Sequence, residues 1–384
     1  MRVTLIIICI FFLWTSCTSI ENLEPNQTST FLKFYSETNT MNSRDLLALE
    51  DGYLILSIYD ESNTLLLKTD LSGNKLWASS LDNFKGNALA EVDDGYIIIG
   101  DRIDTQTAST LMELIKTNKT DGTIKNTTTI GDGFQHGSAI TTSSTGGLIA
   151  SGYTSAANKD SIIIMEYDNN LNRNWSAPRQ YSNSSPSKSI YEQDSLISWL
   201  SYSNQNQSVN ITEANIDRES PKWDNRLFDT ETAANFNGDI ALLNTGYAII
   251  QTITRIEAKI GVAFYNDGII SSEVIINNGA FASGNYTAAS LINIDNGILV
   301  IATTDVHTGD KDRKDTDLLL LELNYDGTVK SAGINETFGG FGDEIPMRIR
   351  KTIEGEYVIL GTVVNTKGAQ QTFLLKTNKK GRLD

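Results

Sequence analysis

Apolar runs of β-strand character recur seven times along the chain, each directly after a turn. The residues that precede these runs are Gly52, Gly95, Gly147, Ser195, Gly246, Gly297 and Glu356. Successive copies lie 43 to 59 residues apart, a repeat length typical of propellers and solenoids, in which each unit packs only on its neighbours. The pattern therefore predicts an all-β repeat protein of seven units.

One repeat unit consists of four short strands. In the first copy the runs LLAL, YLILSIY, TLLLKTD and KLWASSL begin at Leu46, Tyr53, Thr64 and Lys75, and turn residues separate them. Connections this short join antiparallel neighbours. A third-strand run also recurs in every copy, beginning at Thr64, Thr110, Ser161, Ser208, Ile260, Asp317 and Thr372. We therefore predict a seven-bladed β-propeller of four-stranded antiparallel blades.

The last copy lacks a fourth strand. After its third-strand run only a turn beginning at Asn378 and the last residues of the chain remain, whereas the segment TFLKFYSET, from Thr30, precedes the first copy. Pairing of this segment with the last blade would close the ring and remove a free sheet edge. We predict that the N-terminal strand completes the last blade, and that one propeller domain spans residues 30–384.

Residues 1–16 have the pattern of a secretory signal peptide. Arg2 precedes an apolar run from Val3 to Trp14, which is too short for a permanent membrane-spanning helix. Small residues then precede Cys17, as in bacterial lipoprotein signals, although Trp14 stands where a leucine is usual. We expect lipid attachment at Cys17 and a flexible tether over residues 17–29. The alternative is cleavage elsewhere, which leaves Cys17 as a free thiol.

Two motifs carry a family resemblance. They are LLKTDLSGNKLW, from Leu66 to Trp77, and FGGFGDE, from Phe338 to Glu344. Together with the Gly-Tyr-apolar strands, they resemble secreted and lipid-anchored β-propeller-repeat proteins of Bacteroidetes-type bacteria. The resemblance implies the propeller fold and a place in the cell envelope, at the outer membrane. It lends no catalytic residue, because most members of that group are uncharacterised.

The net charge of the chain indicates which classes of binding partner to expect. The sequence has 47 acidic and 31 basic residues, a formal net charge of −16. Such a surface repels phosphates, so we expect no nucleic-acid partner, and it favours cationic or neutral ligands. We expect a monomeric domain that meets the membrane through its N-terminal lipid.

Few residues offer recognisable chemistry. The two histidines, His136 and His307, lie in different repeats, and Cys9 belongs to the signal peptide, so neither a zinc site nor a Cys/His nucleophile is indicated. We predict no cofactor, no metal and no catalytic residue. The most acidic segment contains Asp310, Asp312, Asp315 and Asp317 between basic residues. A solvated hairpin is the preferred interpretation, and a cation or partner site is the alternative.

Phenylalanines recur in the loops that lead into the innermost strands. They are Phe84, Phe134, Phe236, Phe281 and Phe341. In a propeller these loops all emerge on one face, so the rings either fill gaps between blades or form an aromatic platform for a sugar or peptide. The filling of gaps between blades is the preferred interpretation, and the platform is the alternative that we take as the candidate binding site.

The sequence thus predicts a membrane-anchored lipoprotein that binds or scaffolds a protein or glycan partner without catalysis. The alternative is a glycan-acting enzyme of glycosidase or lyase type, because two or three convergent carboxylates suffice for glycoside cleavage. Buried carboxylates that converge on the channel mouth would favour the enzyme.

Overall fold

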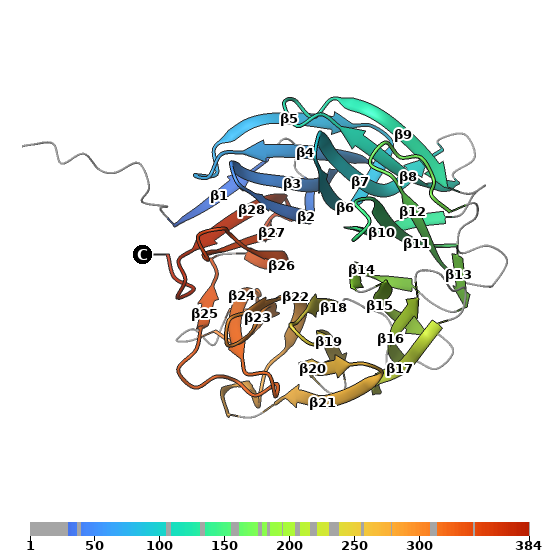
Figure 1. The fold of residues 1–384 in the computed structure, drawn as a ribbon. Coiled ribbons are helices and arrows are strands. Elements are labelled where there is room, and N and C mark those ends of the chain that lie inside the picture. The colour runs from blue at the N-terminus through green and yellow to red at the C-terminus, as the bar shows by residue number, and fades with distance from the viewer. Residues whose placement is uncertain are drawn as a thin grey trace, which may run out of the picture.

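The computed structural model describes residues 30–36, 40–104, 109–130, 135–154, 161–175, 179–182, 185–193, 195–203, 208–215, 221–229, 238–254, 257–277, 279–307, 313–340 and 342–383. These residues form seven four-stranded antiparallel sheets around a central axis (Figure 1). The predicted seven-bladed β-propeller is confirmed. Within these ranges, no helix is long and apolar enough to span a membrane.

The strands of each blade follow in order from the axis outward. Blade 1 contains β2 (Met41–Leu49), β3 (Gly52–Tyr59), β4 (Asn63–Thr69) and β5 (Lys75–Leu81). Blade 2 contains β6 (Phe84–Val92), β7 (Gly95–Ile103), β8 (Thr110–Thr117) and β9 (Ile124–Ile130). Blade 3 contains β10 (Gln135–Thr142), β11 (Leu148–Thr154), β12 (Ser161–Tyr167) and β13 (Arg179–Ser182). Blade 4 contains β14 (Ser185–Gln193), β15 (Leu196–Ser203), β16 (Ser208–Asn215) and β17 (Pro221–Asp229).

The remaining blades complete the ring. Blade 5 contains β18 (Asp239–Leu242), β19 (Tyr247–Thr254), β20 (Ala258–Asn266) and β21 (Ile269–Ile276). A 3-10 turn, η2 (Gly279–Phe281), leads into blade 6, which contains β22 (Tyr286–Ile294), β23 (Gly297–Thr304), β24 (Asp317–Leu323) and β25 (Asn335–Phe338). Blade 7 contains β26 (Gly342–Lys351), β27 (Tyr357–Asn365), β28 (Gln370–Thr377) and, outermost, β1 (Phe31–Tyr35).

The recurring glycine before the second strand has a steric cause. A Cβ added at Gly52 would lie 1.9 Å from the carbonyl oxygen of Thr69, at the end of the third strand. The same approach, at 2.0 to 2.4 Å, recurs at Gly95, Gly147, Gly246 and Gly297. In these five blades a side chain would not fit where the turn meets the third strand, so packing within the blade explains the recurring glycine. Blades 4 and 7 carry Ser195 and Glu356 at this position.

A second repeated feature is an ion pair between the third strand of a blade and the turn before its second strand. Lys68, Lys116 and Lys376, each next to last in a third strand, are buried. Lys116 Nζ lies 2.7 Å from Asp94 and Lys376 Nζ lies 2.7 Å from Glu356, while Lys68 pairs with Asp51. The lysine of the Leu-Leu-Lys motif therefore holds the first turn of its own blade against the third strand.

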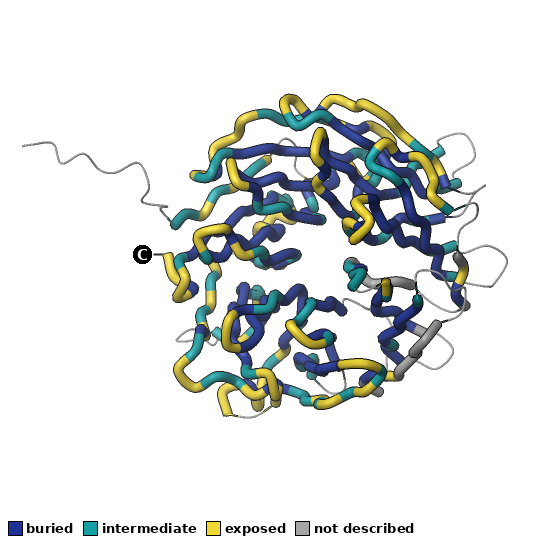
Figure 2. The backbone as a smooth tube through the Cα atoms, viewed as in Figure 1, coloured by how far each residue is buried: buried dark blue, intermediate teal, exposed yellow. Residues whose placement is uncertain are grey.

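The hydrophobic core lies between the blades. Figure 2 shows buried backbone in the inner and middle strands and exposed backbone along much of the rim. One cluster joins Leu56 and Leu66 of blade 1 to Leu89 and Ile98 of blade 2, and further clusters of this kind follow around the ring. Middle strands are covered on both faces, which explains their nearly continuous apolar sequence.

The N-terminal strand closes the ring as predicted. β1 runs antiparallel to β28, with Phe31 opposite Lys376 and Tyr35 opposite Thr372. One face of β1 packs on blade 1: Tyr35 Oη donates a hydrogen bond of 2.7 Å to the carbonyl of Gly73, and the Phe31 ring lies 6.1 Å from that of Tyr53. The two ends of the chain thus share one blade.

Deletion of residues 30–36 should open this ring. The loss of two packed aromatic side chains and of the β28 edge pairing should lower the free energy of unfolding by at least roughly 3–5 kcal/mol. Chemical denaturation and limited proteolysis measure the change. The control is a deletion of residues 18–29, which retains β1 and should behave as the full chain. Equal protease resistance of the two deletions would show that β1 does not close the ring.

Candidate functional site

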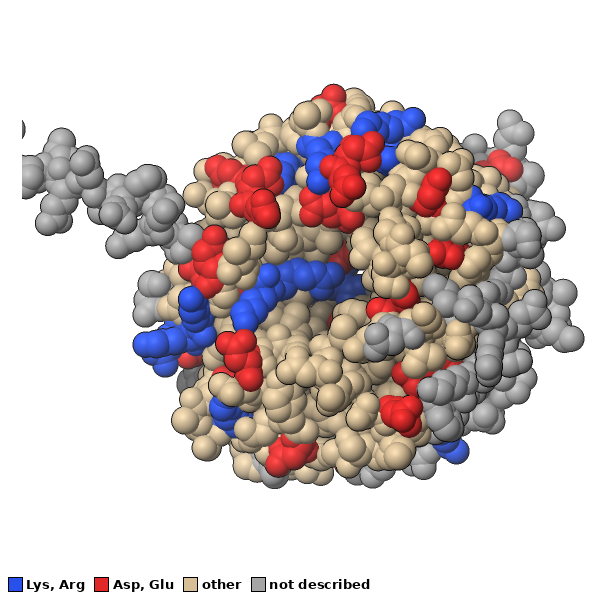
Figure 3. All heavy atoms as spheres, in the orientation of Figure 1, with Lys and Arg blue, Asp and Glu red and all other residues tan. Residues whose placement is uncertain are grey.

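The centre of the propeller is hollowed and carries a charge opposite to that of the chain. Figure 3 shows a band of Lys and Arg side chains inside the central hollow of one face, with acidic side chains scattered around it. Most of the innermost strands contain a bulge, which leaves an extra residue outside the pairing. Bulges follow Ser43 in β2 and Pro346 in β26, beside Asp45 and Arg348.

Arg348 is the centre of a buried ionic network, which we call the axial network. Its Nε donates to Asp45 Oδ1 at 3.0 Å, and its Nη1 donates to both oxygens of Asp239 at 3.2 Å. The arginine and both carboxylates are 2% exposed. Burial lowers the pKa of Arg348, but the charges of Asp239 and Asp45 more than offset this, and the pKa is raised above its usual value.

The carboxylates of the axial network are also fully hydrogen bonded. Asp239 accepts from the hydroxyls of Ser189 at 2.6 Å and Ser290 at 2.7 Å. Asp45 accepts from the backbone N–H of Leu46 and, in the next blade, from that of Leu89, both at 2.9 Å. Every blade except blade 3 therefore contributes a described group to one network. Satisfied in this way, the buried charges stabilise the relative position of the blades.

Arg44 differs from Arg348 because one of its guanidinium nitrogens lacks a described hydrogen-bond partner. It is the bulged residue of β2, and its Nε is buried without a hydrogen-bond partner among the described residues. Burial lowers the pKa of Arg44, and the charge of Asp101 opposes that shift. Since a guanidinium with an unsatisfied N–H group favours an anion, Arg44 is a candidate to contact a ligand.

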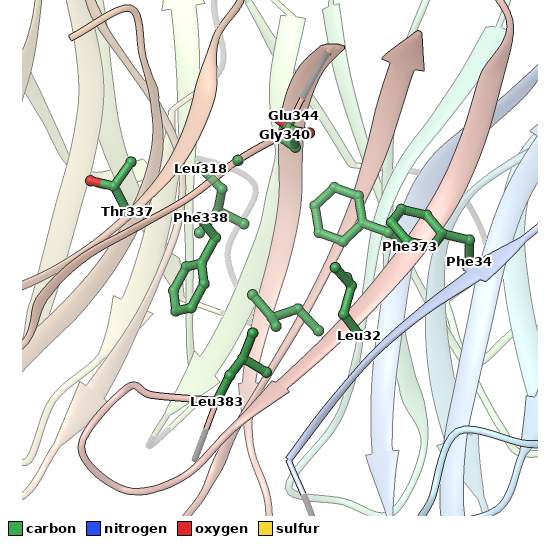
Figure 4. Close-up of a pocket in the computed structure, with 11 residues that line it drawn as sticks. Leu32, Phe34, Leu318, Thr337, Phe338, Gly340, Glu344, Phe373 and Leu383 are labelled. Atoms are coloured by element: carbon green, nitrogen blue, oxygen red, sulfur yellow. The ribbon is translucent and has the colours of Figure 1, made fainter. Parts of the chain in front are cut away.

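A second hollow lies at the rim, where blade 7 meets blade 6. We call it the seam pocket. Its volume is about 320 Å³, and its lining is mainly apolar. Leu318 and Phe338 form the blade 6 wall, and Leu32, Phe34 and Phe373 form the blade 7 wall (Figure 4). Glu344 and Gly340 lie at one end of the pocket and Leu383 lies at the other.

Glu344 is the titratable group of the seam pocket. Burial raises its pKa to about 7, a backbone hydrogen bond from Gly340 opposes this, and the charges of Asp317 and Asp315 raise it further. Its Oε2 atom is buried without a hydrogen-bond partner among the described residues. The pocket therefore combines an apolar lining with one carboxyl group that changes charge near neutral pH.

The acidic segment beside this pocket is ordered in its described part. Arg313 binds Asp315 through two hydrogen bonds of 2.9 Å and Asp317 through one of 2.8 Å, while Asp317 also accepts from His307 Nδ1 at 3.0 Å. Asp310 and Asp312 lie outside the described residues. From Arg313 to Asp317, the segment forms an ion-paired wall rather than a solvated hairpin.

The loop phenylalanines and the anchor are placed only in part. Phe84 is fully buried against blade 1, with the Arg102 guanidinium 5.3 Å from its ring centre. Phe281 is buried 5.3 Å from the ring of Tyr286. Neither ring is exposed to a ligand. Phe134, Phe236, Phe341 and Cys17 lie outside the described residues, and the binding roles of the phenylalanines stay predictions.

Each histidine is held by a carboxylate rather than grouped with other ligands. His136 Nδ1 lies 3.1 Å from Asp101 Oδ2, and its ring stacks on Tyr153 at 4.7 Å. His307 contacts Asp317 and the carbonyl of Asp315. In the described ranges, no three His, Cys, Asp or Glu residues gather as metal ligands do.

Seven closed blades around a buried ionic axis define the class of the protein, a β-propeller. No family model and no curated protein matches the sequence. The fold is similar to the plexin A4 extracellular region (TM-score 0.53, 7% identity), covering 91% of this chain and 51% of that one.

Two enzymes with solved structures have a similar fold. The polysaccharide lyase Uly1 matches with a TM-score of 0.51 and 10% identity over 95% of this chain and 94% of its own. The Pyrococcus horikoshii acylaminoacyl peptidase matches with a TM-score of 0.50 and 10% identity over 89% of this chain. The chain spans about half the length of the peptidase and of plexin A4. These similarities establish the fold alone.

Replacement of Arg348 by methionine should strongly destabilise the protein. It removes the buried cation that binds both Asp45 and Asp239. Loss of one partner from a buried ion pair costs roughly 3–5 kcal/mol, because a carboxylate is left buried without its cation.

Urea denaturation at pH 7 measures this loss. Arg350→Met is the matched control, because Arg350 is partly exposed and contacts Asp45 at 3.2 Å. It should cost less than about 1 kcal/mol. Equal losses for the two variants would contradict the role assigned to the axial network.

Proposed function

We propose that the protein is a membrane-anchored propeller that binds or scaffolds a protein or glycan partner and has no catalytic activity. The observation that carries this proposal is the central hollow, which presents a basic band in a chain of net charge −16. Concave surfaces lined by one sign of charge concentrate ligands of the opposite sign. The partner therefore presents a carboxylate or another acidic group to the hollow.

The arrangement of carboxylates supports binding over glycan cleavage. A glycosidase holds two carboxyl groups free on either side of the scissile bond. Asp45 and Asp239 are the buried carboxylates of the axial network, and Arg348 lies between them and binds both. Both acids are occupied by a structural cation, so neither is available as acid, base or nucleophile. A glycan-acting enzyme stays the competing prediction, through residues other than these.

The proposed anchor is a lipid on Cys17. The first strand, β1, begins at Phe31, so 13 residues separate Cys17 from the first strand of the propeller. Extended backbone spans about 3.3–3.6 Å per residue, which gives the tether a reach of at most roughly 50 Å. A tether of this length holds the propeller near the bilayer while leaving its faces accessible.

Replacement of Cys17 by alanine should release the protein from membranes. The full chain, expressed in a bacterial host with lipoprotein processing, should sediment with membranes and incorporate labelled palmitate. Cys17→Ala should lose the label and lose most of the membrane-bound fraction. Cys9→Ala is the control, since this residue belongs to the signal peptide, and should keep both. A labelled Cys17→Ala protein would contradict the proposed anchor.

Replacement of Arg44 by glutamine should weaken the binding of acidic polymers in the hollow. Polygalacturonate and polyglutamate share carboxylates, and titration calorimetry should show that both bind the wild type, whereas neutral dextran does not. Loss of one charge-assisted contact should weaken binding about tenfold.

The control for this experiment is Lys119→Gln, which removes a surface charge that pairs with Glu91. It should bind the polymers as the wild type does. Two results would contradict the proposal: equal binding by the Arg44 and Lys119 variants, or new reducing ends in the polygalacturonate, which would reveal an enzyme.

A further inference from the structure

The seam pocket lies beside the outer edge of blade 6, which is short. Its outermost strand, β25, has four residues, whereas β5 and β9 have seven each. Leu32 and Phe34 project from β1 toward blade 6, and they are 46% and 53% exposed. The short strand does not cover them, so an apolar hollow remains between the walls of Leu318 and Phe373 (Figure 4).

The polar end of the pocket is built by the Phe-Gly-Gly motif. A Cβ at Gly339 would lie 1.8 Å from Asp317 Oδ1, so only glycine allows the loop to pass here. Gly340 binds Glu344 through its N–H and accepts a hydrogen bond from Arg313 through its carbonyl. The second carboxyl oxygen of Glu344 is left buried without a described partner. This oxygen lacks a hydrogen-bond donor, and a bound ligand can supply one.

The charged residues around Glu344 determine which ligand charge the pocket favours. Arg313 is bound by Asp315 and Asp317, and His307 is bound by Asp317. These groups come from blade 6, and the two aspartates outnumber the one permanent cation. The local potential at Glu344 is therefore negative, which favours a cationic group and disfavours a carboxylate.

We propose that the seam pocket binds a small ligand with an apolar body and a single ammonium group, and that the ammonium pairs with Glu344. The apolar body lies between Phe338 and Phe373 and extends toward Leu383. A volume of about 320 Å³ is at the small end of the range for ligand sites. This site is distinct from the central hollow, and the proposal does not depend on the function of that hollow.

The test uses three ligands of the same length: octylammonium, octanol and octanoate. Titration calorimetry on the full-length protein at pH 7.5 should give binding in the order ammonium, alcohol, carboxylate. Glu344→Gln keeps the size of the side chain and removes its charge. It should weaken octylammonium binding about tenfold and leave octanol binding unchanged.

The pH dependence provides a separate readout. Because the pKa of Glu344 is raised to about 7, the carboxyl is neutral at pH 5.5 and ionised at pH 8. The affinity for octylammonium should therefore rise about tenfold or more between these pH values, while that for octanol should stay constant. In Glu344→Gln both affinities should be independent of pH.

The location of the site is tested by two exposed apolar residues. Phe34→Ser removes part of the pocket wall and should abolish octanol and octylammonium binding. Ile269→Ser is the matched control, because Ile269 is 67% exposed on β21, away from the pocket. Three results would overturn the proposal: no saturable binding of octylammonium, equal affinity for octylammonium and octanol, or unchanged ammonium binding in Glu344→Gln.

Discussion

Ring closure by the pairing of β1 with β28 is the constraint on which the rest of the structure depends. A blade buries its middle strands only when a neighbour covers each face, and a ring gives every blade two neighbours. The chain ends after three strands of blade 7, so Phe31–Tyr35 supplies the fourth. The same strand packs on blade 1 through one face and lines the seam pocket with the other. Ring closure therefore determines both the packing of the core and the shape of the seam pocket.

The axial network connects the blades at the centre of the ring, as β1 connects the first and last blades at the rim. Arg348 joins two carboxylates that come from blades 1 and 5, and serines of blades 4 and 6 complete their hydrogen bonds. Buried charges gain little over apolar packing of the same volume, but removing one partner is costly. The network therefore specifies how the blades are placed relative to one another. Beside it, Arg44 has a buried Nε atom without a described partner, and this residue and the basic band of the central hollow are the basis of the proposed binding function.

The sequence was informative where a feature repeats and uninformative where it occurs once. The blade count, the order of strands and the closing strand follow from apolar runs, turn residues and an incomplete last copy. The axial network does not follow, because Asp45 and Arg348 are 303 residues apart and no local pattern pairs them. A charged residue inside a strand that faces the axis is the one signal that could have indicated it. The seam pocket arises from a single short strand, β25, which no repeat predicts, whereas attention to the loop phenylalanines led to Phe84 and Phe281, which are buried.

Native-state hydrogen exchange of the full-length protein tests ring closure most directly. If β1 and β28 form one blade with blade 1 beside it, the amides of residues 31–35 that donate to β28 should exchange with the same opening free energy as the amides of residues 372–376. Rapid exchange of residues 31–35 together with protected residues 372–376 would show that the N-terminal strand is not part of the ring, and would contradict the account.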